Sequence, residues 1–460
     1  MDLLIKNGLL VSAGGRSNAD IGILEGKIAR ISDSIPEQGC SRVLDATDCI
    51  VTPGGVDPHV HLTPPTREEG GWKWVDDFDS GTETALAGGV TSVGNISFPE
   101  RGESIRTAID VDGAEASKLA RADFFLHPVL LEPNDENLRE IPALHAEGHT
   151  SIKFFLSFRR FDRQVDSYLK AMRSVGSSGG IALIHCEDAA IMECCCNLLR
   201  ESGDLSAEHY PHSRPVHAEA VATRRAIAFS ETTDCPVYIV HLASGEALRA
   251  CTEGRARSIK TFVETRPLYL HLTEEKYKEE GGARYAGAPP LRSKEDVFRL
   301  WAGLSFGDVD TIATDHAPWM LADKLDSKRD ATTLLPGVAE LETNMPMLFS
   351  SGVLEGKITL EKFVALTSTN AAKLFGLYPR KGSLSIGADA DLVVWDPNEV
   401  RSIDSMKTKT RCDYSPYEGW SVKGWPRYTV SRGELVAQGS EVIGEPGRGE
   451  LILRGPHQSL

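Results

Sequence analysis

The chain has 460 residues, 41% of them hydrophobic, and a formal net charge of −16 from 66 acidic and 50 basic side chains. This length exceeds that of an ordinary single-core domain, and the negative charge disfavours nucleic acid and anionic membranes as partners. The opening MDLLIKNGLLVS predicts a strand and a turn rather than a signal peptide, and no window reaches the roughly 18 unbroken apolar residues of a membrane span. Nine cysteines without CxxC spacing indicate free thiols and a cytoplasmic location.

The two ends of the chain share alternating apolar residues interrupted by Asn-Gly, Glu-Gly and Arg-Gly turns, which is the pattern of β-strands. Strands are expected over 3–12, 19–32, 41–47, 389–397 and 423–439. We infer a small β-sandwich domain built from residues 1–52 and 379–440. The Gly- and Pro-rich tail, residues 441–460, is expected on the surface or against a neighbouring subunit.

Between these ends, short apolar runs alternate with helical stretches such as DVFRLWAGLSF. The runs predicted as strands are 56–62, 90–96, 123–131, 151–157, 180–187, 236–243, 259–267 and 310–317. Eight strands alternating with helices predict an α/β fold, a (β/α)8 TIM-type barrel over residues 53–378. The alternative is an open doubly wound sheet, which is disfavoured because no strand precedes a GxGxxG loop. A late helix is expected over 359–376, ended by Gly376.

Potential metal ligands lie near the C-terminal ends of five predicted strands, where barrel enzymes place their chemistry. His59 and His61 are two residues apart in the first strand, so their side chains share a face. A single histidine in such a place is most often a hydrogen-bonded core residue, but the whole set predicts a metal site. The set is His59, His61, Lys153, His185, His241 and Asp315.

Lys153 lies inside the apolar run SIKFFL, where a charged ammonium group is costly. It is either one half of a buried ion pair or a neutral amine that captures carbon dioxide. The resulting carbamate would be an anion with two oxygens, suited to bridging two cations. Two divalent ions with neutral histidines, this carbamate, the Asp315 carboxylate and a hydroxide would keep one net positive charge, which can polarise a carbonyl.

These motifs resemble the amidohydrolase superfamily and, within it, the hydantoinase and dihydropyrimidinase family. The resemblance covers nearly the whole chain and rests on PGGVDPHVHL, GHTSIKFFLSF, IHCEDAAI, YIVHLASG, SRPVHAEAVA, ATDHAP and LTSTNAAKLFGLYPRKGSLSIGADADLVVWDP. It implies a homotetramer or dimer with two divalent ions, usually zinc. The ligands it implies are His59, His61 and Asp315 for one ion, His185 and His241 for the other, and carboxylated Lys153 as the bridge.

The activity implied by this resemblance is hydrolytic ring opening of a small cyclic amide to an N-carbamoyl amino acid. Asp315 is the expected catalytic residue, since it can accept a proton from the attacking water and pass it to the leaving ring nitrogen. Allantoinase is an alternative, supported by the Phe-Leu-Ser that follows the strand-four lysine but not by the C-terminal segments. Dihydroorotase is disfavoured because Thr63 replaces the usual arginine after HxHL. A non-catalytic scaffold related to dihydropyrimidinase is disfavoured because all six ligand positions are intact.

Four expected substrate-contacting positions depart from the hydantoinase pattern. Phe158 stands where the family has a tyrosine whose hydroxyl stabilises the oxyanion, and losing such a donor costs on the order of a hundredfold or more in rate. Thr333 replaces an asparagine, and Ala288 replaces a serine whose contact is often made by the backbone. Arg266 replaces the cysteine of Glu-Thr-Cys-Pro.

Arginines are expected around the mouth of the predicted pocket. Arg266 should lie at the mouth of strand seven, with Arg67, Arg159 and Arg160 in loops at the rim. One interpretation is that they are solvated surface residues. The functional interpretation is that they bind an anionic substituent of the substrate.

Overall fold

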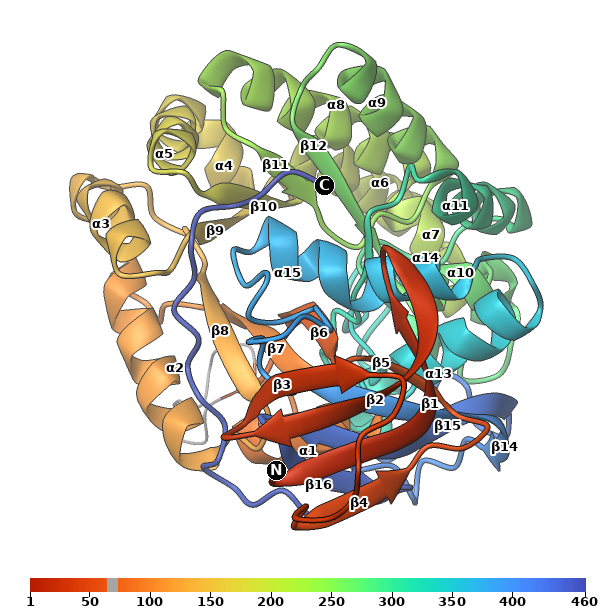
Figure 1. Ribbon diagram of the computed structural model, residues 1–460. Helices are drawn as coiled ribbons and strands as arrows, with labels where there is room; N and C mark the ends of the chain where they lie inside the picture. The colour runs from red at the N-terminus through yellow and green to blue at the C-terminus, as the bar shows by residue number, and fades with distance from the viewer. Residues whose placement is uncertain (64–72) are drawn as a thin grey trace.

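The computed structural model describes residues 1–63 and 73–460 and has a parallel barrel as its central element (Figure 1). The barrel strands among the described residues are β6 (Gly55–Val60), β7 (Val90–Ser97), β8 (Asp123–Pro128), β9 (Ser151–Phe155), β10 (Ile181–His185), β11 (Val237–Ile239), β12 (Thr261–Thr265) and β13 (Thr311–Ile312). Strands β6 to β8 pair in parallel, as do β9 to β13. Parallel bridges from Val129 to Lys153 and from Val60 to His316 close the two groups into one ring. The predicted (β/α)8 barrel is confirmed.

Helices connect successive strands and cover the outside of the barrel (Figure 1). The longer ones are α1 (Phe78–Ala87), α2 (Ile105–Leu119), α3 (Asp135–Ala146), α5 (Val165–Ser177), α6 (Ala189–Ser202), α8 (Val216–Thr233), α9 (Gly245–Ala256) and α11 (Lys294–Phe306). The short ones are α4 (Arg159–Arg163), α7 (Tyr210–Ser213), α10 (Pro267–His271), α12 (Leu321–Lys324), α13 (Asn344–Leu348), α14 (Leu360–Val364) and α15 (Asn370–Leu374). The helix predicted over 359–376 forms as α14 and α15 joined by a wider π turn, and Gly376 follows with φ +69°.

A buried carboxylate fastens the first barrel strand to the last. Asp57 in β6 accepts hydrogen bonds from the backbone N–H groups of His59 at 3.1 Å and Thr314 at 3.1 Å. Burial raises the pKa of Asp57 to about 7. Because His59 and Thr314 flank the ends of β6 and β13, this carboxylate holds together the seam at which the metal-ligand candidates meet.

Both ends of the chain form one mixed β domain beside the barrel (Figure 1). Its strands are β1 (Leu3–Ser12), β2 (Gly15–Leu24), β3 (Lys27–Ser32), β4 (Arg42–Asp45), β5 (Ile50–Pro53), β14 (Leu392–Ser402), β15 (Ser421–Ser431), β16 (Glu434–Gln438) and β17 (Glu441–Val442). The sheet curls until β3 reaches the start of β14 through a bridge from Lys27 to Asp389. Its inner face buries Ile21, Val51 and Leu392. The predicted β-sandwich domain from both ends is thus confirmed.

The C-terminal tail packs against the barrel of its own chain. The backbone of Glu450 accepts a hydrogen bond from the N–H of Phe124 at 2.9 Å, and Arg454 donates its N–H to Gly148 at 3.0 Å. Ile452 is buried. Since Phe124 is the second residue of β8 and Gly148 precedes β9, the tail crosses the N-terminal end of the barrel, opposite the expected site.

All nine cysteines are free, and five of them are buried, as the sequence predicted. Within residues 1–63 and 73–460, no helix is both long and apolar enough to cross a bilayer.

Candidate metal centre

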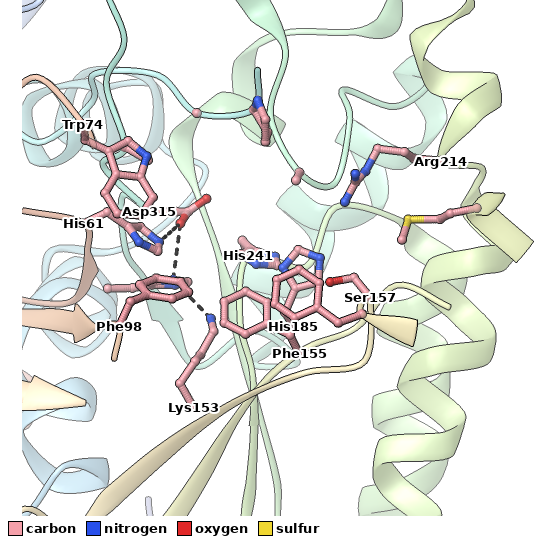
Figure 2. A pocket seen from close by; sticks show the side chains of 17 residues that line it. His61, Trp74, Phe98, Lys153, Phe155, Ser157, His185, Arg214, His241 and Asp315 are labelled. Carbon is pink, nitrogen blue, oxygen red and sulfur yellow. Dashed lines mark hydrogen bonds and ion pairs between the residues drawn. The ribbon is translucent and has the colours of Figure 1, made fainter. Parts of the chain in front are cut away.

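All six predicted ligands line a single pocket at the C-terminal end of the barrel (Figure 2). They are His59, His61, Lys153, His185, His241 and Asp315. Each of these residues is at least nine-tenths buried. Residues from five strands, up to 256 positions apart in the chain (315 − 59), are therefore brought to one place by the closure of the barrel.

His59, His61 and Asp315 form the tightest group, with one potential ligand atom from each lying within 4.8 Å of the others. Oδ1 of Asp315 is 2.9 Å from Nε2 of His61 and 3.3 Å from Nε2 of His59. His61 lies one residue past the end of β6, yet its N–H still donates to the carbonyl of His316 at 2.9 Å. The strand pairing therefore continues far enough to keep both imidazoles on the inner face, as predicted.

The strands end earlier than the apolar runs predicted. β11 stops at Ile239 and β13 at Ile312, so His241 and Asp315 lie in the loops that follow. Both residues have left-handed backbone conformations, with φ +40° and +48°. Such conformations are uncommon for residues with a side chain and cluster at functional sites.

Lys153 lies between the two pairs of histidines. Its Nζ is 3.2 Å from Nε2 of His59, and Figure 2 shows the amine pointing from β9 into the pocket. The rings of His185 and His241 are 4.5 Å apart, and those of His59 and His241 are 5.5 Å apart. The lysine thus contacts His59, whose ring lies beside that of His241.

Burial keeps the pocket's histidines uncharged. It lowers the pKa of His61 to about 4 and the pKa values of His59 and His241 well below the ordinary range. It also lowers the pKa of Lys153 to about 8, which leaves part of this lysine as a neutral amine near neutral pH. Burial alone would raise the pKa of Asp315, but the neighbouring charges hold it well below its usual range. The site therefore offers neutral imidazoles and an ionised carboxylate.

The donor set fits a divalent cation. Nε2 of His59 and Nε2 of His61 both face Oδ1 of Asp315, at 3.3 and 2.9 Å, so three potential ligand atoms already lie around one place. Neutral imidazole and carboxylate are the common ligands of zinc and related ions.

Two buried carboxylates orient the histidines, and the sequence reasoning assigned neither of them a role. Oε1 of Glu264 is 2.8 Å from Nδ1 of His59, and Oε2 of Glu187 is 2.7 Å from Nε2 of His185. Partners of this kind fix the ring orientation of metal-binding histidines. Only the positions of these two glutamates could have indicated this role in the sequence. Glu187 follows His185 by two residues, and Glu264 is the second-to-last residue of β12.

Beside the six ligand candidates, the pocket walls are mostly apolar, with several aromatic side chains. They include Trp74, Phe98, Phe155, Phe158 and Met192. Phe158 and Ala288, both expected to contact substrate, line the pocket.

Two polar lining residues, Ser157 and Arg214, were not predicted as site residues. In Figure 2 they lie on the side opposite Trp74 and His61. Nε of Arg214 donates to Oε1 of Glu187 at 3.0 Å, and Nη2 pairs with the other oxygen of that carboxylate.

The prediction that Arg266 lies at the pocket mouth is wrong. Arg266 is fully buried and pairs with Asp315 and Glu340, so it is not among the lining residues. Thr333 is exposed, bonds to Asp330 and does not line the pocket either. The sequence could not show that the side chain of Arg266, which follows β12, points into the protein interior.

The rim arginines are also placed differently from the expectation. Arg159 pairs with Glu193 at 2.5 Å and Arg160 with Glu132 at 3.1 Å, and neither lines the pocket. Arg67 lies outside the described residues. Of the arginines in the described part of the chain, the pocket wall contains Arg214.

Comparisons with known proteins agree with this arrangement. The profile of the amidohydrolase family matches residues 50–436. D-hydantoinase of Geobacillus stearothermophilus is 35% identical over 100% of this chain and 98% of its own length, and D-phenylhydantoinase of Escherichia coli is 36% identical over 99% of each. The crystal structure of dihydropyrimidinase from Brevibacillus agri NCHU1002 covers 100% of both chains with a TM-score of 0.94 and 32% identity. The chain therefore belongs to the amidohydrolase family, as a hydantoinase-like member.

Proposed function

We propose that this protein is a hydrolase that opens a small cyclic amide of the hydantoin or dihydropyrimidine type, giving an N-carbamoyl amino acid. The convergence of six potential ligands in one aromatic pocket carries this proposal. The relatives named as hydantoinases, which match over the full chain, support it. The aromatic walls suit a flat ring or an aromatic substituent.

The proposed cofactors are two divalent metal ions, and zinc is the metal we propose. His59, His61 and Asp315 would hold one ion, and His185 with His241 the other. Lys153, carboxylated by carbon dioxide, would bridge them, which its buried, partly neutral amine favours. When bound, the ions would supply a Lewis acid that polarises the substrate carbonyl and lowers the pKa of water.

The chain's own groups would orient the substrate and move the proton. Asp315 would accept a proton from the attacking water and donate it to the leaving ring nitrogen. The aromatic side chains would hold the ring and exclude other water. Phe158 has no hydroxyl, so it cannot donate a hydrogen bond to the developing oxyanion.

The polar wall favours a substrate with a hydrogen-bond acceptor or an anionic group on the side of Arg214. Two of the Arg214 nitrogens are occupied by Glu187, and Nη1, which has no hydrogen-bond partner within residues 1–63 and 73–460, is left for a ligand. Ser157 lies on the same side of the pocket (Figure 2). An Arg214→Lys variant should raise KM for a carboxylate-bearing hydantoin at least tenfold more than KM for phenylhydantoin. Equal effects on both substrates would contradict an anionic preference.

A substrate panel with metal analysis tests the whole proposal. Purified protein is expected to hold two equivalents of zinc per chain and to hydrolyse hydantoins or dihydrouracil faster than allantoin or dihydroorotate. Lys153→Ala should lose both metal and turnover. Preferred turnover of allantoin would favour the allantoinase alternative. A protein that gains neither metal nor activity from zinc and bicarbonate would be a scaffold.

We also propose a homotetramer or dimer, on the basis of the resemblance alone. Sedimentation of the purified protein tests it, and a monomer at micromolar concentration would contradict it.

A further inference from the structure

We propose that Arg266 is a positioning residue that holds Asp315 in the orientation required at the metal centre. The inference rests on the proposed function, because it concerns a ligand of the proposed ions. It assigns a role to a residue that neither lines the pocket nor faces solvent.

The two oxygens of Asp315 are used by different partners. Oδ1 faces His61 at 2.9 Å and His59 at 3.3 Å. Oδ2 accepts a hydrogen bond from Nη1 of Arg266 at 2.8 Å. The guanidinium therefore holds the oxygen that points away from the histidines and directs the other one at the centre.

Arg266 is itself held on its other side. Its Nε donates to Oε2 of Glu340 at 2.8 Å, and Oε1 of Glu340 accepts a hydrogen bond from the hydroxyl of Tyr417. The backbone N–H of Glu340 is 3.2 Å from Nδ1 of His316, the residue after Asp315. Arg266, Glu340 and Tyr417 are completely or almost completely buried. The guanidinium group is planar and rigid, and it binds Glu340 on one side and Asp315 on the other. Fixing its position through Glu340 therefore also fixes the side chain of Asp315.

The backbone at Asp315 needs such an anchor. Its φ of +48° is a conformation that costs free energy for a residue with a side chain and persists where the surroundings enforce it. β13 has ended three residues earlier, at Ile312, and pairing with β6 resumes only at His316, so the strands leave the side chain of Asp315 to be oriented by other contacts. The hydrogen bond from Arg266 acts on the side chain directly.

A purely structural ion pair is the competing explanation, and the two make different predictions. If Arg266 and Glu340 formed only a structural ion pair, removing them would change the stability of the protein and nothing else. A positioning role also requires that zinc binding and turnover change when the guanidinium is removed and the charge balance is kept. Loss of an outer partner of a metal ligand typically costs 10- to 100-fold in affinity or activity.

The test uses full-length variants and measures zinc affinity by chelator competition, kcat, KM and melting temperature. Arg266→Met combined with Glu340→Gln removes both charges and keeps volume. We expect its zinc affinity to fall by about 10- to 100-fold and kcat at saturating zinc to fall similarly, with KM nearly unchanged. Glu340→Gln alone keeps the contact from Arg266 to Asp315 and should retain both quantities within about threefold. Arg266→Lys keeps the charge and should recover part of the loss.

Arg255→Met is the matched control. Arg255 pairs with Asp310 and donates from Nε to the carbonyl of Thr261 at 2.8 Å, at the opposite end of the same strands. This variant should lower the melting temperature and leave zinc affinity unchanged.

Wild-type zinc affinity and kcat in the double variant would overturn this inference alone. If the double variant does not fold, the two single variants Arg266→Lys and Glu340→Gln are compared instead. Equal zinc affinities in these two proteins would also overturn the positioning role of Arg266. A wild-type chain that binds no divalent ion would overturn the proposed function together with this inference.

Discussion

Nδ1 of His59 lies 2.8 Å from Oε1 of Glu264, and both side chains are fully buried. The same oxygen accepts the backbone N–H of His241 at 2.7 Å. The carboxyl group of Glu264, near the end of β12, thus holds the side chain of His59 from β6 and the backbone of His241, which follows β11. Nε2 of His59 is left to face Lys153 and Asp315.

Replacing Glu264 should weaken the metal centre. In Glu264→Gln the side chain keeps its size, but an NH2 donor replaces one carboxyl oxygen and competes for the place of the acceptor shared by His59 and His241, so zinc affinity and kcat/KM should fall by about 10- to 100-fold. Glu219→Gln is the control, since Glu219 is equally buried and accepts the N–H of Ala243 at 2.7 Å without contacting a ligand candidate. Zinc titration of both proteins checks this, and equal losses would contradict a specific role for Glu264.

Restoring the missing donor should accelerate the reaction. Phe158 lines the pocket and stacks on Phe155, with ring centroids 5.0 Å apart. In Phe158→Tyr a hydroxyl enters the pocket, and kcat on the best substrate should rise by about tenfold or more. Phe98→Tyr places a hydroxyl on another wall and should give no such gain. Steady-state kinetics that show no increase for Phe158→Tyr would mean that another group already stabilises the oxyanion.

The C-terminal tail should stabilise the barrel without serving the reaction. Ile452 is 2% exposed and the adjacent Leu453 is 60% exposed. Ile452→Ala should lower the free energy of unfolding by about 2–5 kcal/mol, whereas Leu453→Ala should change it by less than about 1 kcal/mol. Urea unfolding measures both, and kcat of the folded Ile452→Ala protein should match wild type. Equal destabilisation by the two variants would show that the tail is not packed as described.

Acid should destabilise the metal-free protein through buried neutral histidines. Burial lowers the pKa of His145 to about 4 from an ordinary value of 6.5. Because the unfolded chain binds the proton more tightly, this contribution to stability is complete above pH 6.5 and is lost as the pH falls toward 4. For His145 the loss by pH 4 is about 3 kcal/mol. In His145→Leu, urea unfolding between pH 7 and 4 should show a shallower decline than in wild type. An unchanged slope would mean that this histidine is protonated in the folded protein.

The alternation of apolar runs with helices was enough to predict the barrel and the β domain. Strands buried on both faces must be apolar throughout, and turns between them need Gly, Asn or Asp. Both features can therefore be recognised in short stretches of sequence. The convergence of six side chains was predictable for the same reason, since each lies within a strand or at most three residues beyond it, and strand ends converge in a closed barrel. These are His59, His61, Lys153, His185, His241 and Asp315.

Only the tertiary structure decided the outer partners and the pocket walls. Whether Arg266 faces solvent or Asp315 depends on Glu340, which is 74 residues away in the chain. Arg214 and Glu187 come together in the same way, from the segment before α8 and the end of β10. The tail was expected at the surface or a neighbouring subunit, but its backbone donors and acceptors pair with the N-terminal end of the barrel. Local sequence sets the period and the ends of strands, whereas the partner of a buried charge is set by which distant segment lies beside it.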